Sequence, residues 1–484
     1  MNGARTVTAL PNTEQCVVIG SGPGGCVTAY HLAAAGRSVT VLEDGQYLSL
    51  DSAPAFSRAE MEQKYRNGGL TLAFGPARVQ YVEGRVVGGG SEINSGLYHR
   101  TPPAVLARWR DEYKVADLDD ERDLGPHFED NERRLNVSYL PSEDAMAPIA
   151  RMLRLGATRM GWESREVPRW FKYDAGAVGG GRRQSMSETY VPAMLEAGAK
   201  LAPGVRVTAL ERNGMGWIVH GRRNDAYREP FEIAADKVFV SAGAIQTPAI
   251  LQRSGLKTNV GKSLRMHPTA KFVAEFPDEI NDENAGVPSE QVKQFSPDIS
   301  FGCSISSREH LAVALYGHRS ARKDLRSTWR RMATYYAMAQ GTGSGAVRVL
   351  PAFSDPLVSY ALAKEDAERL VRGMRLLAEL LFAAGAIALY PVVNGAPVLR
   401  SKDDIAGIES WFKPADANLM TIHLFSSVPM GERRDLCAVD SYGRVHGQPS
   451  LWVADGSMLP TSTTVNPQGS IMAIARRNVL EALR

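Results

Sequence analysis

The most informative stretch of the chain is CVVIGSGPGG, at residues 16–25 of 484. Its first four residues are apolar and mostly β-branched, which is typical of a strand buried on both faces. The next six spell GxGxxG, and residues 28–35 then predict a helix that ends at Gly36. Residues 38–42 predict a second strand, with Glu43 at its end. This order of strand, glycine turn, helix, strand and acid is typical of a Rossmann dinucleotide-binding unit.

Each glycine of this unit has a separate physical role. Gly20 permits the tight turn, Gly22 lets the backbone approach a pyrophosphate, and Gly25 allows the helix to pack closely on the strand. The helix N-terminus offers free N–H groups and a partial positive charge to the phosphates. Glu43 can accept hydrogen bonds from ribose hydroxyl groups. A glycine-rich turn without a nucleotide is the competing interpretation, and the unit alone is equally compatible with FAD and NAD.

A second glycine cluster lies at residues 84–98, with the sequence GRVVGGGSEINSGLY. Gly88, Gly89 and Gly90 leave three positions without a side chain, which suits a backbone in van der Waals contact with a flat or phosphorylated ligand. The alternative is a flexible surface loop. The flanking residues are apolar and β-branched rather than rich in Ser, Pro or Asp, and they favour the ligand-binding interpretation.

Residues 84–98 closely resemble the first signature of the glucose–methanol–choline (GMC) oxidoreductase family. Residues 241–256, SAGAIQTPAILQRSGL, resemble its second signature, although Lys257 follows where a glycine is more usual. Residues 453–468 resemble its closing motif. Together with the N-terminal unit, these matches occur in the family's order, which makes coincidence a negligible explanation. The stretch from about 266 to 415 carries no such match.

The resemblance implies an α/β fold: a Rossmann-type FAD-binding domain with a second α+β substrate-binding domain, whose sheet is covered by helices. We predict that the FAD-binding domain is discontinuous and is built from 14–50, 78–105, 185–265 and 424–484. Residues 51–77 are predicted to form a lid-like excursion. The substrate-binding or cap domain is predicted to comprise 106–184, largely helical, and 266–423. Such a cap would exclude water from the reacting group.

The resemblance also implies FAD rather than NAD as the cofactor. It implies that Gly20, Gly22 and Gly25 hold the pyrophosphate and that Glu43 holds the adenosine ribose. Some family members tether the flavin covalently through a histidine whose place is taken here by Ile93, so non-covalent FAD is expected. The resemblance further implies that Asp455 lies near the ribityl chain and that the backbone of Val207 contacts the adenine. The residues that it places against the isoalloxazine are Gly88, Gly89, Gly90, Ser91, Asn94, Asn466 and Pro467. The role of His99, which follows the first signature, stays open.

His423 stands out among the nine histidines by its surroundings. The segment MTIHLFSSVPMG, residues 420–431, resembles the family's histidine-containing segment, and Asn466 follows 43 residues after His423, within the family's narrow spacing. A neutral imidazole can accept a hydroxyl proton while a carbonyl forms. The amide NH₂ of Asn466 can bind the alcohol oxygen and stabilise developing negative charge on it. For His267, in the segment LRMHP, a structural role is the favoured interpretation, and no chemical role is assigned to His446.

These features predict an FAD-dependent alcohol dehydrogenase or oxidase in which His423 is the general base and flavin N5 accepts the hydride. The alternatives are a non-redox flavoprotein lyase or decarboxylase on the same fold, and a flavin-binding protein without catalysis. The substrate is expected to be a small-molecule alcohol, such as a sugar, an amino-sugar, a polyol or a natural-product alcohol. The electron acceptor is O₂ or another carrier.

Composition narrows the setting of this chemistry. A formal net charge of +3 without a Lys/Arg block gives no support for binding to nucleic acid or to an anionic membrane. The four cysteines are scattered, so no metal site or disulfide framework is expected. Residues 1–14 show no signal peptide, and no apolar run approaches the roughly 20 residues of a membrane-spanning helix. A cytoplasmic protein is the resulting expectation.

Overall fold

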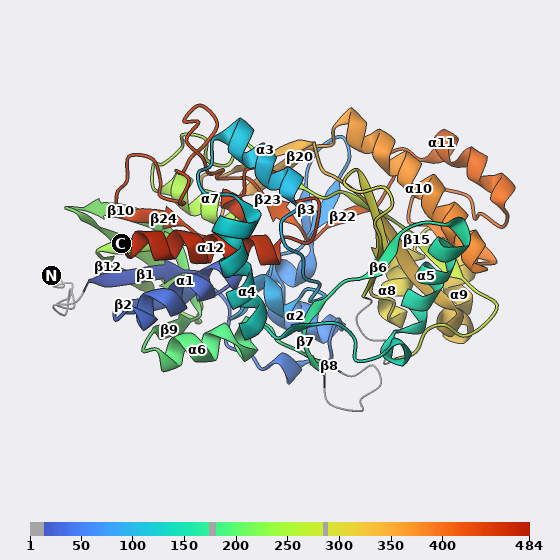
Figure 1. Cartoon of the computed structure of the whole chain (residues 1–484), viewed down its shortest axis with the longest axis horizontal. Coiled ribbons are helices and arrows are strands. Elements are labelled where there is room, and N and C mark those ends of the chain that lie inside the picture. Colours follow the sequence, from blue (N-terminus) through green and yellow to red (C-terminus); the bar gives the residue numbers. More distant parts are fainter. Residues whose placement is uncertain (1–13, 174–180, 284–288) are drawn as a thin grey trace.

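The computed structural model describes residues 14–173, 181–283 and 289–484. Residues 1–13, which make up nearly all of the segment in which we find no signal peptide, lie outside this part. Two large sheets lie toward opposite ends of the long axis, each with its own helices (Figure 1). The α/β fold class predicted from the sequence, a Rossmann-type unit with a second sheet-and-helix domain, is confirmed.

The first sheet is parallel and five-stranded, in the order β24-β13-β1-β2-β9. Its central strand β1 is buried along its whole length, as its apolar sequence predicts. Helix α1 packs on this sheet and contacts α6 and α12. A three-stranded antiparallel sheet contacts it as well. The bounds are β1 Gln15–Ile19, α1 Pro23–Ala34, β2 Ser38–Glu43, α6 Tyr190–Glu196, β9 Lys200–Pro203, β10 Val205–Asn213, β11 Gly216–Arg223, β12 Pro230–Ala235, β13 Lys237–Val240, β24 Leu451–Val453 and α12 Gln468–Ala482.

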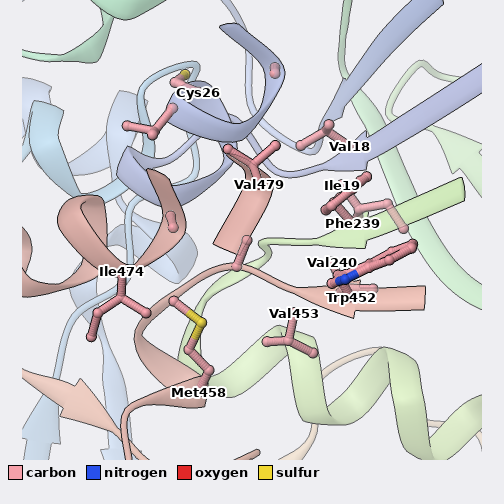
Figure 2. Packing of buried hydrophobic residues seen from close by; sticks show 14 of the residues in the cluster. Val18, Ile19, Cys26, Phe239, Val240, Trp452, Val453, Met458, Ile474 and Val479 are labelled. Atoms are coloured by element: carbon pink, nitrogen blue, oxygen red, sulfur yellow. The ribbon is translucent and has the colours of Figure 1, made fainter. Parts of the chain in front are cut away.

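Segments far apart in the sequence share the core around this sheet (Figure 2). Val18 from β1 and Val240 from β13 are fully buried, and Ile474 from α12 packs within the same cluster. The rings of Phe239 and Trp452 stack with their centroids 4.9 Å apart. The last helix of the chain is therefore part of the first nucleotide-binding unit.

The second sheet has nine strands, eight in the order β3-β4-β22-β15-β18-β17-β16-β6, with β21 paired to β15. Helices α5 and α10 pack against one face, and α8 packs against β18. Helix α10 ends at Ala384 and is followed by the capping residue Gly385, which adopts a φ of 105°. The bounds are β3 Thr71–Ala73, β4 Val79–Tyr81, α5 Pro148–Met160, β6 Ser164–Glu166, β15 Thr269–Glu275, β16 Glu290–Val292, β17 Ile299–Cys303, α8 Arg308–Ala314, α9 Arg319–Thr328, β18 Met332–Ala339, α10 Lys364–Ala384, β21 Ala388–Pro391, α11 Ile408–Trp411 and β22 Leu419–Thr421.

Shorter elements connect the two sheets. Strands β14 and β23 pair antiparallel, as do β19 and β20, and β5, β7 and β8 form a small sheet. Among the described residues, no helix has both the length and the apolar content needed to cross a membrane. The bounds are α2 Arg58–Lys64, α3 Pro103–Tyr113, α4 Gly125–Arg134, β5 Val137–Ser138, β7 Arg169–Tyr173, β8 Gly181–Arg183, α7 Gly243–Arg253, β14 Arg265–Met266, β19 Ser344–Arg348, β20 Leu357–Ala361 and β23 Leu424–Phe425.

Some segments differ from their predicted structure. The stretch 106–184, predicted to be largely helical, also contains strands β5 to β8, because short strands of two to five residues carry no clear sequence period. Trp109 of α3 and Phe128 of α4 pack in the core of the five-stranded sheet rather than in the second domain. Strand β4 lies in the segment 78–105, which is predicted for the FAD-binding domain, but it pairs with β22 and so belongs to the nine-stranded sheet. The domain boundaries as a whole stay a prediction.

Candidate active site

The glycine-rich motifs of the sequence meet at the N-terminus of α1. A Cβ atom on Gly20 would lie 2.4 Å from the carbonyl oxygen of Ser241, and one on Gly24 would lie 1.8 Å from that of Ala454. A Cβ on Gly89 would lie 2.8 Å from the Cα of Gly22. Backbone from the first unit, both family signatures and the closing motif therefore approaches to distances that only glycine allows.

Ser21 and Glu43 hold this junction together. The Glu43 carboxylate accepts hydrogen bonds from Ser21 N at 3.0 Å, Ser21 Oγ at 2.7 Å and Gly45 N at 2.7 Å. Gly88 N donates to Ser21 Oγ at 3.1 Å, which links the first glycine turn to the second. Burial raises the pKa of Glu43, while these hydrogen bonds oppose the increase. Glu43 therefore braces the turn that the sequence predicts to hold the pyrophosphate.

The first signature folds into a tight turn at Gly89–Glu92, preceded by Gly88 with a φ of 98°. Ser91 Oγ donates to Gly88 O at 2.8 Å and accepts from Met186 N at 3.0 Å, so it shapes the turn. Asn94 Nδ2 donates to Gln468 Oε1 at 3.0 Å, which ties the turn to α12.

Asp455 joins the second signature to the closing motif. Its carboxylate accepts from Gly243 N at 2.9 Å, from Thr247 Oγ1 at 2.5 Å and from Ser457 N at 2.8 Å. Burial raises the pKa of Asp455. Val207 is buried in β10, where the pairing with β11 shifts register directly after it.

The glycine junction, together with Glu43, Ser91 and Asp455, forms a cradle that fits a dinucleotide. A Cβ on Gly22 would meet no protein atom within 4 Å, and the same holds for Gly90, so both face open space. Gly22 is the N-cap residue of α1 and carries no side chain to cap it, which leaves the helix N-terminus available to a phosphate. Ser241 Oγ is buried and has no hydrogen-bond partner among the described residues. Open space, free donors and an unpaired hydroxyl suit the phosphates of a dinucleotide such as FAD.

His423 and Asn466 come together as the sequence predicts. His423 lies between β22 and β23, and Asn466 lies just before α12. His423 Nε2 is 3.2 Å from Asn466 Nδ2. On the other side of the ring, His423 Nδ1 is 3.0 Å from His267 Nδ1. The two imidazole planes stand at 88° to each other.

The surrounding amides define the orientation of this pair. Gln291 Nε2 donates to Asn466 Oδ1 at 3.4 Å, so Asn466 presents its NH₂ group to His423. An amide NH₂ only donates, so His423 Nε2 accepts and carries its lone pair. The single proton of neutral His423 then lies on Nδ1 and is donated to His267 Nδ1. His423 Nε2 is thus the basic atom.

Burial keeps the imidazoles of this site neutral. Burial lowers the pKa of His423 to about 3, and the nearby charge of Lys293 acts in the same direction. The pKa values of His267 and His99 also lie well below the ordinary histidine value, again chiefly because of burial. Lys293 is itself buried, and burial lowers its pKa to about 7.

Sequence reasoning missed several residues of this site. His267, for which it favoured a structural role, contacts His423 directly. Gln291 and Tyr336, linked by a hydrogen bond of 3.1 Å, lie in the stretch that carries no family motif. His99, whose role the sequence leaves open, lies near Gln291 and Lys293, and both influence its pKa. His446 makes a contact of 3.3 Å with Gly431 O.

Comparisons with known proteins identify the family of this chain. The family model described as GMC oxidoreductase matches residues 61–269 with its N-terminal part and 342–475 with its C-terminal part. A model described as an NAD(P)-binding Rossmann-like domain matches residues 18–75. The matched residues therefore include the first glycine turn, both signatures and the closing motif.

Related proteins are similar along almost the whole chain. An uncharacterised GMC-type oxidoreductase of Sinorhizobium fredii is 38% identical, covering 96% of this chain and 94% of the relative. A long-chain-alcohol oxidase of Arabidopsis thaliana is 27% identical, covering 97% of this chain and 69% of the relative. A solved FAD-dependent oxidoreductase from Chaetomium thermophilum has the same fold, with a TM-score of 0.71 at 16% identity over 97% of this chain and 99% of the other. The chain therefore belongs to the GMC oxidoreductase family of FAD-dependent enzymes.

Proposed function

We propose that this protein oxidises the CH–OH group of a small-molecule alcohol to a carbonyl, with His423 as the general base. The observation that supports this most strongly is the basic Nε2 atom of His423, placed 3.2 Å from the amide nitrogen of Asn466. The alcohol oxygen would replace the direct hydrogen bond between these two atoms, donating its proton toward Nε2 and accepting a hydrogen bond from Asn466 Nδ2. The long-chain-alcohol oxidase relative is consistent with this reaction class.

Each of the three protein residues has a separate role in the proposed reaction. His423 Nε2 takes the hydroxyl proton, and Asn466 Nδ2 stabilises the negative charge that develops on oxygen as the proton leaves. His267 fixes the His423 ring through Nδ1, which keeps the lone pair on Nε2. Bound FAD would supply the two-electron acceptor, taking the hydride of the carbinol carbon at N5.

We further propose that FAD is held non-covalently by the cradle described above. Ile93, at the place of the family's tethering histidine, is buried and offers no nucleophile. In this assignment Gly20, Gly22 and Gly25 face the pyrophosphate and Glu43 the adenosine ribose. The ribityl chain is assigned to Asp455 and the adenine to Val207. The residues assigned to the isoalloxazine are Gly88, Gly89, Gly90, Ser91, Asn94, Asn466 and Pro467.

Anaerobic mixing of the FAD-loaded protein with a panel of alcohols tests the proposed function. We expect at least one alcohol to bleach the oxidised-flavin absorption band, with one carbonyl product formed per flavin reduced. A lyase or decarboxylase would form product while the flavin stays oxidised. If no alcohol bleaches the flavin in protein shown to contain stoichiometric FAD, alcohol oxidation is contradicted.

The pH dependence of kcat/KM provides a second prediction. His423 with a pKa of about 3 stays neutral and basic as pH falls, so kcat/KM for a neutral alcohol should hold its plateau from about pH 8 down to about pH 5. A histidine with an ordinary pKa would lose roughly 30-fold at pH 5. Of the neighbouring groups, Lys293 gains charge in this range, which favours neutral His423 further, while His267 and His99 stay neutral. An acid limb near pH 6.5, with the fold intact by circular dichroism, would contradict this assignment.

A further inference from the structure

Lys293 lies on the face of the nine-stranded sheet that borders His423 and Asn466. It directly follows β16, and alternate residues of an extended strand point to the same face. Val292 points to the opposite face, where it packs in the core with α5 and α10. Gln291, two residues before Lys293, bonds to Asn466 Oδ1 and to Tyr336. Lys293 therefore shares its face with a residue that touches the catalytic pair.

The ammonium group of Lys293 is buried without a partner. The residue is 5% exposed, and Nζ makes no hydrogen bond to any residue of the described part of the chain. Other lysines in the interior are paired: Lys64 Nζ donates to Leu50 O at 2.9 Å, and Lys271 Nζ donates to Ser304 Oγ at 3.1 Å. Burying an unpaired ammonium is costly, which is why burial lowers the pKa of Lys293 to about 7, and a bound anion would stabilise the charged form.

The charge that acts on Lys293 is the positive charge of Arg165. Arg165, on the neighbouring strand β6, pairs with Gln291 in the sheet and is exposed to solvent. Besides the neighbouring imidazoles, the groups whose charge acts on His423, His267 and His99 are Lys293 and Arg165. The site thus has positive groups from its exposed rim at Arg165 to the buried Lys293, and its imidazoles are neutral. These two positive side chains favour an anion beside the catalytic pair.

We propose that Lys293 binds the carboxylate of an anionic alcohol, so that the substrates of this enzyme are hydroxy acids. The inference rests on the proposed function, since the alcohol group of the same molecule would bind His423 and Asn466. One buried ammonium matches one negative charge, which fits a carboxylate better than a doubly charged phosphate. The pair would also repay the cost of burying the lysine.

Matched acids and amides test the assignment in the FAD-loaded enzyme. We would compare ω-hydroxyhexanoate with ω-hydroxyhexanamide, and para-(hydroxymethyl)benzoate with its amide, by the rate of flavin reduction. The wild type is expected to favour at least one acid over its amide by about 10-fold or more in kcat/KM. Lys293→Met should raise KM for that acid by about 10- to 100-fold and leave the amide within about 3-fold, whereas Lys293→Arg should retain part of the preference.

Two further measurements separate the possible failures. Lys271→Met removes another lysine of this sheet and should leave the acid preference unchanged. Benzoate binding to the oxidised holoenzyme, followed by calorimetry, should weaken in Lys293→Met by the same factor as the acid substrate. If no alcohol reduces the flavin, the proposed oxidation fails while benzoate binding still tests the lysine. Equal rates for wild type with acids and amides, or an equal loss with both in Lys293→Met, would overturn the assignment.

Discussion

Replacing His423 by alanine is expected to lower kcat/KM for the alcohol by a factor of about 10² to 10⁴ while FAD stays bound. The variant removes the basic Nε2 atom that lies 3.2 Å from Asn466 Nδ2. It leaves untouched the glycine junction, Glu43 and Asp455, which form the cofactor cradle. Anaerobic stopped-flow measurement of flavin reduction isolates the affected step, because it excludes reoxidation of the flavin.

His446→Ala is the matched control for this variant. His446 is a partly buried histidine whose ring contacts Gly431 O, and it has no contact with the catalytic pair. Its replacement should leave the reduction rate within about 2-fold, as expected for a residue outside the machinery. A His423→Ala enzyme that reduces its flavin as fast as the control would contradict the assigned base and would favour a flavin-binding protein without His423-dependent catalysis.

The sequence predicts the nucleotide-binding unit well because its determinants are local. The glycine turn, the flanking strands and Glu43 all lie within the first 43 residues, and each is found where predicted. Helix α1 begins at Pro23 rather than at Thr28, because proline at the first helical position needs no N–H partner and already has a helical φ.

The partners of His423 depend on long-range pairing that no local pattern carries. His267 meets His423 because β14 and β23 pair antiparallel, with Met266 opposite Leu424. The register between two-residue strands separated by more than 150 residues is set by the folded sheets around them. Gln291, on β16 of the nine-stranded sheet, bonds to Asn466, which lies 175 residues further along the chain, just before α12. The pair His423 and Asn466 could be identified because both lie in segments with a family motif.

Adding one methyl group at neighbouring glycines should separate cofactor binding from folding. A Cβ on Gly24 would lie 1.8 Å from the backbone oxygen of Ala454, whereas a Cβ on Gly22 would meet no protein atom within 4 Å. The backbone of Gly22, with φ −68° and ψ −177°, is allowed for alanine. Gly24→Ala should therefore destabilise the protein itself by about 3 kcal/mol or more, since the two backbone segments must move apart.

For Gly22→Ala we expect an apoprotein with an unchanged Tm but an affinity for FAD weakened by roughly 10-fold or more, because the methyl group fills the space predicted for the pyrophosphate. For Gly24→Ala we expect the apoprotein Tm to fall by about 5 °C or more. Thermal unfolding of both apoproteins and titration with FAD by fluorescence provide the comparison. If Gly22→Ala bound FAD like the wild type, the pyrophosphate would have to lie elsewhere, and the open space beside Gly22 would lose its assigned role. If Gly24→Ala kept the wild-type Tm, the close approach of α1 to the closing motif would not be a constraint on the fold.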